Sequence, residues 1–418
     1  MREMKDSGID WIGTIPQDWQ LSKIGSLYTQ RNEKVSDKDY QPLSVTMQGI
    51  LPQLATAAKT NDGGNRKLVR VGDFAINSRS DRRGSCGISP LDGSVSLINI
   101  ILTPRTAMHP GYYNWLFHTT LFADEFYKWG HGIVADLWTT RWQEMKSITV
   151  PVPEYAEQER IAAFLDAECA EIDAVLEKTR ASIEEYKKLK QAVITQAVTK
   201  GIRGDRPMKD SGIEWIGDIP AEWNKDKVIR VFSVIGSGTT PKSSDENLFD
   251  GNTPWIQSGD INGENLFVTK NCVSNSAIES YSALRVYQAP YLVVAMYGAS
   301  VGNLSLSMID ACVNQACCVL KKPTINLKFA FYIFKAVKDY LARKAVGGGQ
   351  PNISQETIKQ LWLTIPSADE QIEISNYLDE KCRSVDALIA KKQQYLTEIE
   401  NYKKSLIYEY VTGKKEVV

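Results

Sequence analysis

The residue types that most often carry out chemistry are few and scattered in this sequence. The phosphate loop Gly-x-x-x-x-Gly-Lys-Ser/Thr, the metal motif His-Glu-x-x-His, the pair Cys-x-x-Cys and the amino-methyltransferase signature Asn/Asp-Pro-Pro-aromatic do not occur. The three histidines show no cluster spacing, and we expect surface or structural roles for His109, His118 and His131. An apolar, strand-like stretch contains Cys312, Cys317 and Cys318, which favours core packing over metal binding. We therefore predict no catalytic residue, no metal site and no cofactor in this chain.

Basic side chains, by contrast, are concentrated in two stretches, one in each half of the 418 residues. Residues 59–83 hold seven basic against three acidic residues, and residues 321–350 hold seven against one. Residues 157–185 carry nine acidic against three basic residues, so the net charge of −1 conceals both basic stretches. A solvated face explains either stretch alone equally well, but their matching positions in the two halves favour nucleic-acid binding.

Each basic stretch is followed by a long segment that occurs twice, as residues 157–203 and 370–415. Both copies open on Glu-Gln and align without a gap at an offset of 213. Apolar residues recur in alternating steps of four and three, as in a coiled coil. The polar positions in this seam coincide as well, Thr179 with Lys392 and Lys190 with Lys403. We therefore expect two helices that pair in one register, and they must run antiparallel because the second starts where the first arrives.

A second repeat opens each half of the chain. Met4–Trp19 returns as Met208–Trp223 with twelve of sixteen residues identical, at an offset of 204. Glycine and proline punctuation predicts an irregular packed arm, and burial is a better explanation than base stacking for the tryptophans, which are Trp11, Trp19, Trp215 and Trp223. The two offsets differ by nine, so the halves match at their edges and diverge inside.

The divergent regions are expected to be mixed α and β. The predicted strands span residues 67–77, 94–103, 291–297, 303–307 and 316–320, and the predicted helices span residues 112–128 and 327–343. Seven cysteines without framework spacing, no signal peptide and no apolar run of 18 residues indicate a cytoplasmic protein that does not cross a membrane.

The combination of these features resembles one known family. Both halves begin with Asp-Ser-Gly-Ile-x-Trp-Ile-Gly-x-Ile-Pro-x-x-Trp, and each ends in a long helix that opens on Glu-Gln after a strand rich in proline. This arrangement is similar to the specificity subunit of type I restriction-modification systems, and the likeness covers nearly the whole chain. The second copy departs at Ser367-Ala368, where the first has Glu154-Tyr155, which affects only the predicted start of the helix.

The resemblance implies an α+β fold with two globular target recognition domains joined by two antiparallel coiled-coil helices, as a pseudo-two-fold internal repeat. The implied parts are recognition domain 1 (residues 1–153), a central spacer helix (154–203), recognition domain 2 (204–366) and a C-terminal spacer helix (367–418). A helix of some 43 residues is about 65 Å long, and we expect this length to set the spacing between two DNA half-sites.

The resemblance also implies partners. Each domain is expected to read one half of an interrupted, asymmetric sequence in double-stranded DNA, and the helices are expected to dock two methyltransferase subunits and up to two restriction subunits. S-adenosylmethionine, ATP and Mg²⁺ then belong to those subunits, and this chain is a non-catalytic member of the complex.

Candidate DNA-contacting residues can be selected in each domain. In the first, the basic stretch supplies Lys59, Arg66, Lys67, Arg70, Arg79, Arg82 and Arg83, for which phosphate positioning is at least as good an interpretation as base reading. In the second, the resemblance points to loops and strand edges that contain Thr240, Lys242, Ser258, Asp260, Tyr297, Asn314, Gln315, Gln350 and Asn352. The amides of Asn314, Gln315 and Gln350 are the preferred base readers, because they can pair with adenine through two hydrogen bonds.

Three alternatives remain open at this point. The chain is also compatible with a specificity subunit of a related system with a split target, with a self-sufficient nuclease or methyltransferase, and with a coiled-coil regulator that binds DNA without a methylase. Turnover by the purified chain alone is the observation expected of an enzyme. Tight specific binding without a partner is expected of a regulator.

Overall fold

The computed structural model describes residues 2–53, 63–132, 138–345 and 351–417, and the chain folds as two compact units. Unit 1 contains residues 1–180 and 393–418, and unit 2 contains residues 181–392. Each unit has a mixed α+β head and one part of each long helix, α5 (Tyr155–Lys200) and α10 (Ala368–Val411). The predicted fold class is therefore confirmed.

The two long helices each begin just before a Glu-Gln pair and end just before a glycine. Glu157 lies in the first turn of α5, and Asp369 and Glu370 lie in the first turn of α10, where a carboxylate is stabilised by the helix dipole. Gly201 and Gly413 follow the helix ends with φ of 77° and 70°, a conformation that glycine adopts without strain.

The predicted seam is the buried stripe of each helix. In unit 1 the most buried residues of this stripe are at most 5% exposed, and they are Leu165, Cys169 and Leu176 of α5 and Leu396 and Leu406 of α10. The other predicted seam positions are buried or half-buried, while most residues between them in the middle of each helix are exposed. Burial of this stripe stabilises each helix pair in the way that the heptad pattern indicates.

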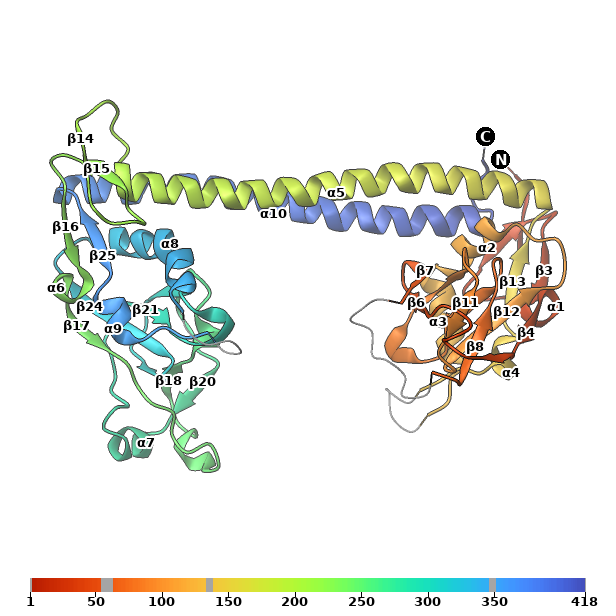
Figure 1. Cartoon of the computed structure of the whole chain (residues 1–418), viewed down its shortest axis with the longest axis horizontal. Helices are drawn as coiled ribbons and strands as arrows, with labels where there is room; N and C mark the ends of the chain where they lie inside the picture. Colours follow the sequence, from red (N-terminus) through yellow and green to blue (C-terminus); the bar gives the residue numbers. More distant parts are fainter. Residues whose placement is uncertain (1, 54–62, 133–137, 346–350, 418) are drawn as a thin grey trace. The chain divides into compact units, whose positions relative to one another are not determined.

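Ion pairs flank the seam and fix its direction. In unit 1 Lys403 pairs with Asp173 at 2.6 Å, and in unit 2 Lys190 pairs with Asp386 at 2.6 Å. In both units a residue early in one helix meets a residue late in the other, so the helices run antiparallel (Figure 1). Lys190 corresponds to Lys403 and Asp173 to Asp386 at the offset of 213, so one contact occurs twice.

The elements of the first head follow one another along residues 1–152. They are β1 Met4–Asp6, β2 Thr14–Pro16, β3 Gln20–Lys23, α1 Ile24–Leu27, β4 Tyr28–Arg31, β5 Lys34–Val35, β6 Leu43–Thr46, β7 Gly49–Pro52, β8 Arg66–Val69, β9 Phe74–Asn77, the 3-10 helix η1 Ser80–Arg82, β10 Cys86–Ile88, β11 Gly93–Val95, β12 Asn99–Pro104, α2 Pro110–Phe117, α3 Thr120–Lys128, α4 Trp142–Met145 and β13 Thr149–Val152.

The second head has a similar order along residues 208–365. Its elements are β14 Met208–Asp210, β15 Asp218–Pro220, β16 Asn224–Lys227, α6 Val228–Val231, β17 Phe232–Gly236, η3 Glu246–Leu248, β18 Thr253–Ile256, η4 Ser258–Asp260, β19 Asn265–Leu266, β20 Asn271–Val273, α7 Asn275–Ser280, β21 Tyr291–Ala295, η5 Gly298–Ser300, β22 Leu304–Ser307, β23 Cys312–Val313, β24 Cys317–Pro323, α8 Leu327–Arg343, α9 Gln355–Lys359 and β25 Trp362–Ile365.

Both heads are built on the same antiparallel sheet. Its order is β10-β9-β12-β4 in unit 1 and β22-β21-β24-β17 in unit 2, where β19 adds an outer strand. Cys86 pairs with Ile76 in the first sheet, and Leu304 pairs with Val294 in the second. The residue numbers of both partners therefore differ by 218 between the two heads. The repeat seen at the edges of the halves thus extends into their divergent interiors.

The predicted elements of the second head are confirmed, and three predictions for the first head are wrong. The predicted helix 327–343 is α8, whereas the predicted helix 112–128 is two helices, because Thr119 accepts a hydrogen bond from Phe122 N and starts a new helix. The predicted strand 67–77 is β8 and β9, separated by a turn in which Gly72 has a φ of 86°. The predicted strand 94–103 is β11 and β12, separated by a turn at residues 96–98.

The tryptophan arms hold the heads against the helix starts. Trp19 donates its indole N–H to Glu157 at 2.9 Å, and Trp223 donates to Glu370 at 2.9 Å. Arg2 pairs with Glu157, and Arg206 pairs with Glu370 at 2.7 Å. Trp19 and Trp223 are 1% exposed, which confirms the predicted structural role of the arms.

The glutamines that follow these glutamates clamp the strand that precedes each helix. The Gln158 side chain donates to the Pro153 carbonyl at 2.8 Å and accepts from His109 N at 2.9 Å. Its counterpart Gln371 donates to Pro366 at 2.9 Å and accepts from Asn326 N at 2.6 Å. The Glu-Gln pair therefore fixes the entry into each long helix.

All seven cysteines are free thiols, and all except the half-buried Cys272 lie in the core, as predicted for three of them. Cys312, Cys317 and Cys318 are fully buried in β23 and β24, and burial raises the pKa of Cys312 to about 11 and that of Cys318 to about 12. No group of three metal-ligating side chains and no helix able to cross a membrane occurs in the described part of the chain.

Candidate nucleic-acid interface

The clearest cationic feature of unit 1 is the turn after β9. Asn77 ends the strand and its side chain accepts a hydrogen bond from Arg79 N at 3.1 Å, after which η1 begins. The side chains of Arg82 and Arg83 are 68% and 52% exposed. Exposed ion pairs of this kind are weak, so both guanidinium groups can exchange a protein carboxylate for a DNA phosphate or base.

Their present partners lie close by. Arg82 is 3.8 Å from Asp81, and Arg83 pairs with Asp124 and lies 6.0 Å from the centre of the Tyr127 ring. The Tyr127 hydroxyl donates to the Asn77 carbonyl at 3.0 Å, so α3 supports the turn that carries the arginines. The turn is therefore anchored while the charged ends face solvent.

Arg66 and Lys67 serve the protein interior, whereas Arg70 forms an exposed ion pair. Arg66 is 3% exposed and donates to the Ser94 side chain and carbonyl, each at 2.8 Å. Lys67 donates to the Asn99 carbonyl at 2.7 Å, and burial lowers the pKa of both cations. Arg70 pairs with Asp92 at 2.8 Å. A DNA contact by Arg66 has no support in this arrangement, because its donors are directed at neighbouring strands.

In unit 2 the polar candidates gather at the ends of two parallel strands. β18 and β23 pair in parallel, so the segments that follow them leave the same edge. Ser258 and Asp260 follow β18 in η4, and Asn314 and Gln315 follow β23. Asn314 N donates to the Ile256 carbonyl at 3.0 Å, which joins the two segments.

Of the two amides in this turn, Gln315 is the accessible one. Asn314 is 9% exposed, and its side-chain oxygen accepts from Ala316 N at 3.1 Å, so it mainly shapes the turn. Gln315 is exposed and accepts from the Thr240 hydroxyl at 2.6 Å. Lys242 is exposed two residues beyond Thr240.

Tyr297 and Asn352 extend the same face. Tyr297 is 45% exposed at the start of η5 and forms an isolated bridge with Asn352. Met296 N donates to the Ala316 carbonyl at 2.8 Å, which connects this loop to the Gln315 turn. The structure thus brings together seven of the nine candidates of this head, which are Thr240, Ser258, Asp260, Tyr297, Asn314, Gln315 and Asn352. Lys59 and Gln350 lie outside the described residues.

Comparison of the two heads identifies a residue that the sequence predictions missed. Arg79 starts η1 as Tyr297 starts η5, and it forms a bridge with Thr139 as Tyr297 does with Asn352. Thr139 therefore occupies in unit 1 the position of Asn352 in unit 2. The offset of 213 between these residues is the same as between the long helices, so extending that alignment would have found Thr139.

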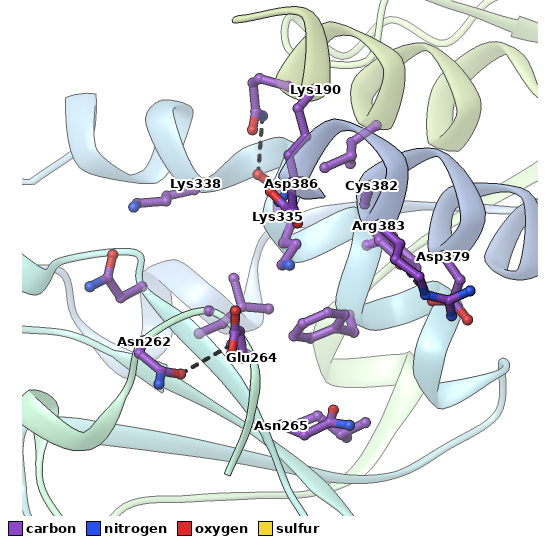
Figure 2. Close-up of a pocket in the computed structure, with 18 of the residues that line it drawn as sticks. Lys190, Asn262, Glu264, Asn265, Lys335, Lys338, Asp379, Cys382, Arg383 and Asp386 are labelled. Carbon is purple, nitrogen blue, oxygen red and sulfur yellow. Dashed lines mark hydrogen bonds and ion pairs between the residues drawn. The ribbon is translucent and has the colours of Figure 1, made fainter. Parts of the chain in front are cut away.

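A separate cleft of about 1090 Å³ lies in unit 2 between α8, the β19–β22 edge and residues of α5 and α10 (Figure 2). Lys335, Lys338 and Arg383 line it, and Lys190 on its wall pairs with Asp386 at 2.6 Å. Burial lowers the pKa of Lys335, and Lys190 lowers it further. None of the predicted DNA-contacting residues that the structure describes lines this cleft.

Comparisons with known proteins agree on one kind of relative. Residues 220–401 match the family model described as type I restriction modification DNA specificity domain. A Methanocaldococcus jannaschii protein described as the MjaX specificity subunit of a type I restriction enzyme is 24% identical over 66% of this chain and 61% of its own length. The MjaVIII specificity subunit from the same organism is 22% identical over 96% of this chain and 94% of its own length.

Two solved structures share the fold. A chain from work on complex assembly and conformational transition of the type I restriction-modification system has a TM-score of 0.75 and 15% identity, over 96% of this chain and 99% of that one. The HsdS subunit from Thermoanaerobacter tengcongensis has a TM-score of 0.52 and 16% identity, over 96% and 98%. At these identities the likeness concerns the fold.

Proposed function

We propose that this chain, which belongs to the specificity subunits of type I restriction-modification systems, selects the DNA sequence on which such a system acts. The matched family model is described as a DNA specificity domain, and a relative that aligns over 96% of this chain is called a specificity subunit. Cations, amides and hydroxyls on exposed turns are the groups that recognise DNA phosphates and base edges.

One observation carries the further proposal that the target is split and asymmetric. Both heads have the same sheet in the same register, yet the matching turns hold different residues: Arg79 stands where unit 2 has Tyr297, and Leu97 stands where it has Gln315. A repeated framework with different reading residues is suited to two different half-sites. Each head then reads one of them.

The long helices have the spacing and docking roles in this proposal. They repeat the same seam and the same lysine–aspartate contact in each unit, so two identical partners find two equivalent surfaces. Two methyltransferase subunits and up to two restriction subunits are the partners that we assign to this complex. Helix length sets the number of base pairs between the half-sites.

In the same proposal, the partner subunits carry out the catalytic steps and bind the cofactors. The methyltransferase subunits hold S-adenosylmethionine, and the restriction subunits hold ATP and Mg²⁺. This chain contributes recognition and positioning, which requires donors and acceptors aimed at DNA rather than a nucleophile or a general base.

Methylome sequencing after co-expression with a methyltransferase subunit of the same system tests the proposal. The expected result is methylation at an interrupted sequence with two unlike halves. Gln315→Ala should relax one half only, whereas Arg82→Ala in the other head should lower the extent of methylation without relaxing either half. A continuous or palindromic motif contradicts the split-target proposal, and methylation or cleavage by the purified chain alone supports a self-sufficient enzyme instead.

A further inference from the structure

Two apolar side chains are exposed on the turn between β11 and β12. Leu97 and Ile98 are 38% and 37% exposed, although leucine and isoleucine are usually buried. The turn is tied to the basic turn after β9, because Ser78 donates to the Ile98 carbonyl from its backbone N–H at 3.3 Å and from its hydroxyl at 2.5 Å. Arg79 follows Ser78 directly. The turn with the apolar pair is therefore bonded to the segment that carries the basic residues.

The matching turn of unit 2 shows what this position offers to a ligand. Asn99 N donates to the Ser96 carbonyl at 3.1 Å, and Cys317 N donates to the Asn314 carbonyl at 3.3 Å, so the two turns have the same backbone bond at an offset of 218. Leu97 then corresponds to Gln315. The same turn presents an amide in one head and a branched alkyl group in the other.

These side chains fit a different feature of the major groove from the one that an amide recognises. A glutamine pairs with adenine N6 and N7, whereas an apolar side chain contacts the 5-methyl group of thymine. We infer that Leu97 and Ile98 select a thymine in the half-site of the first head by packing against its 5-methyl group. This inference rests on the proposed DNA-reading role of the two heads.

Charge favours DNA over a protein partner as the ligand. The exposed guanidinium groups of Arg82 and Arg83 lie on the turn that Ser78 links to Ile98, and they can hold the phosphates on either side of a contacted base. Burial of one methyl group corresponds to about 0.8 kcal/mol, which is about a fourfold change in affinity.

The test replaces each thymine of the target in turn with deoxyuridine, which removes only the 5-methyl group. Binding is measured with the complex of this chain and its methyltransferase, on the target found by methylome sequencing. At one thymine of the first head's half-site, deoxyuridine should weaken binding about fourfold. The double variant Leu97→Ala/Ile98→Ala should bind thymine and deoxyuridine equally well at that position.

Two further variants identify the half-site and test whether the effect depends on the side chain at position 97. Gln315→Ala should affect the other half-site and leave the deoxyuridine effect intact. Leu97→Gln provides a second substitution at the same exposed position and should also abolish the effect.

Three results overturn the inference while the proposed function stands. The first is that deoxyuridine at every thymine of that half-site leaves the binding of the native complex unchanged. The second is that the double alanine variant still binds thymine more tightly than deoxyuridine. The third is that the variant complex loses the methyltransferase while its base preference is unchanged. Absence of any split target refutes the proposed function itself.

Discussion

Replacing Glu370 with alanine should destabilise unit 2 strongly. The Glu370 side chain is 3% exposed and the Arg206 side chain 11%, and their ion pair at 2.7 Å lies beside the indole N–H of Trp223. Glu370→Ala leaves the guanidinium group without its buried carboxylate and the indole N–H without its acceptor. Breaking a buried ion pair costs about 3–5 kcal/mol. Arg206 keeps Glu222 at 3.0 Å and the Lys200 carbonyl at 2.9 Å, so we expect about 3 kcal/mol.

Urea unfolding followed by far-UV circular dichroism measures this loss. With an m-value of about 3 kcal/mol/M, a loss of about 3 kcal/mol moves the midpoint of unit 2 by about 1 M. The control is Glu373→Ala, because Glu373 pairs with Arg203 at 2.8 Å while both side chains are about half exposed, and such pairs contribute less than about 1 kcal/mol. Glu370→Gln should lie between the two, since it keeps an acceptor for Trp223.

The result that refutes this reasoning is a Glu370→Ala midpoint no lower than that of Glu373→Ala. Glu370 would then lie at the helix start without contributing to the stability of unit 2. A further comparison is Glu157→Ala in unit 1, where Glu157 and Arg2 are 13% and 19% exposed. Because this pair is better solvated, we expect a smaller loss than in unit 2.

Three other predictions concern the helices, the thiols and the basic turn. Inserting four residues into the seam of α5 lengthens it by about 6 Å, close to two base-pair steps, and should change the spacer in the methylated target; an identical spacer contradicts the measuring role of the helix. An aromatic disulfide reagent at pH 8 should react quickly with Cys272 alone. The other six thiols are buried, and burial raises the pKa of the Cys86 thiol to about 12. Rapid reaction of several thiols in the folded chain contradicts the packing described. Arg82→Ala and Arg83→Ala should weaken binding to cognate and unrelated DNA equally and lower the salt dependence by about one ion each; a loss confined to cognate DNA would identify a base contact instead.

The long helices were predictable because their signal is local and repeated. A seam from Leu165 to Ala197 follows from four- and three-residue steps, and burial in the structure follows the same steps. The first head was harder to predict, because short strands and the turns between them have similar apolar content. Thr119 and Gly72 each interrupt a segment that looks continuous in sequence, and only their backbone conformations reveal it.

Some residues of the candidate site were predictable from the sequence, and others were not. Gln315 and Tyr297 were selected as residues of loops or strand edges, and the structure joins their two turns through a backbone hydrogen bond. Leu97 was missed because an apolar residue within a predicted strand carries no sign of exposure. Its equivalence to Gln315 appears only when the two sheets are compared in register.

The sequence by itself determined that this chain is a repeat with two arms, two heads and two paired helices, because heptad spacing and constant offsets are properties of the order of residues. Only the tertiary structure decided which cations of the first basic stretch face solvent. Arg66 is buried and donates a hydrogen bond to Ser94, 28 residues away, while Arg82 lies on an exposed turn. The burial of a side chain depends on which strands pair, and these strands can lie far apart in the sequence. The order of charged residues does not indicate that pairing.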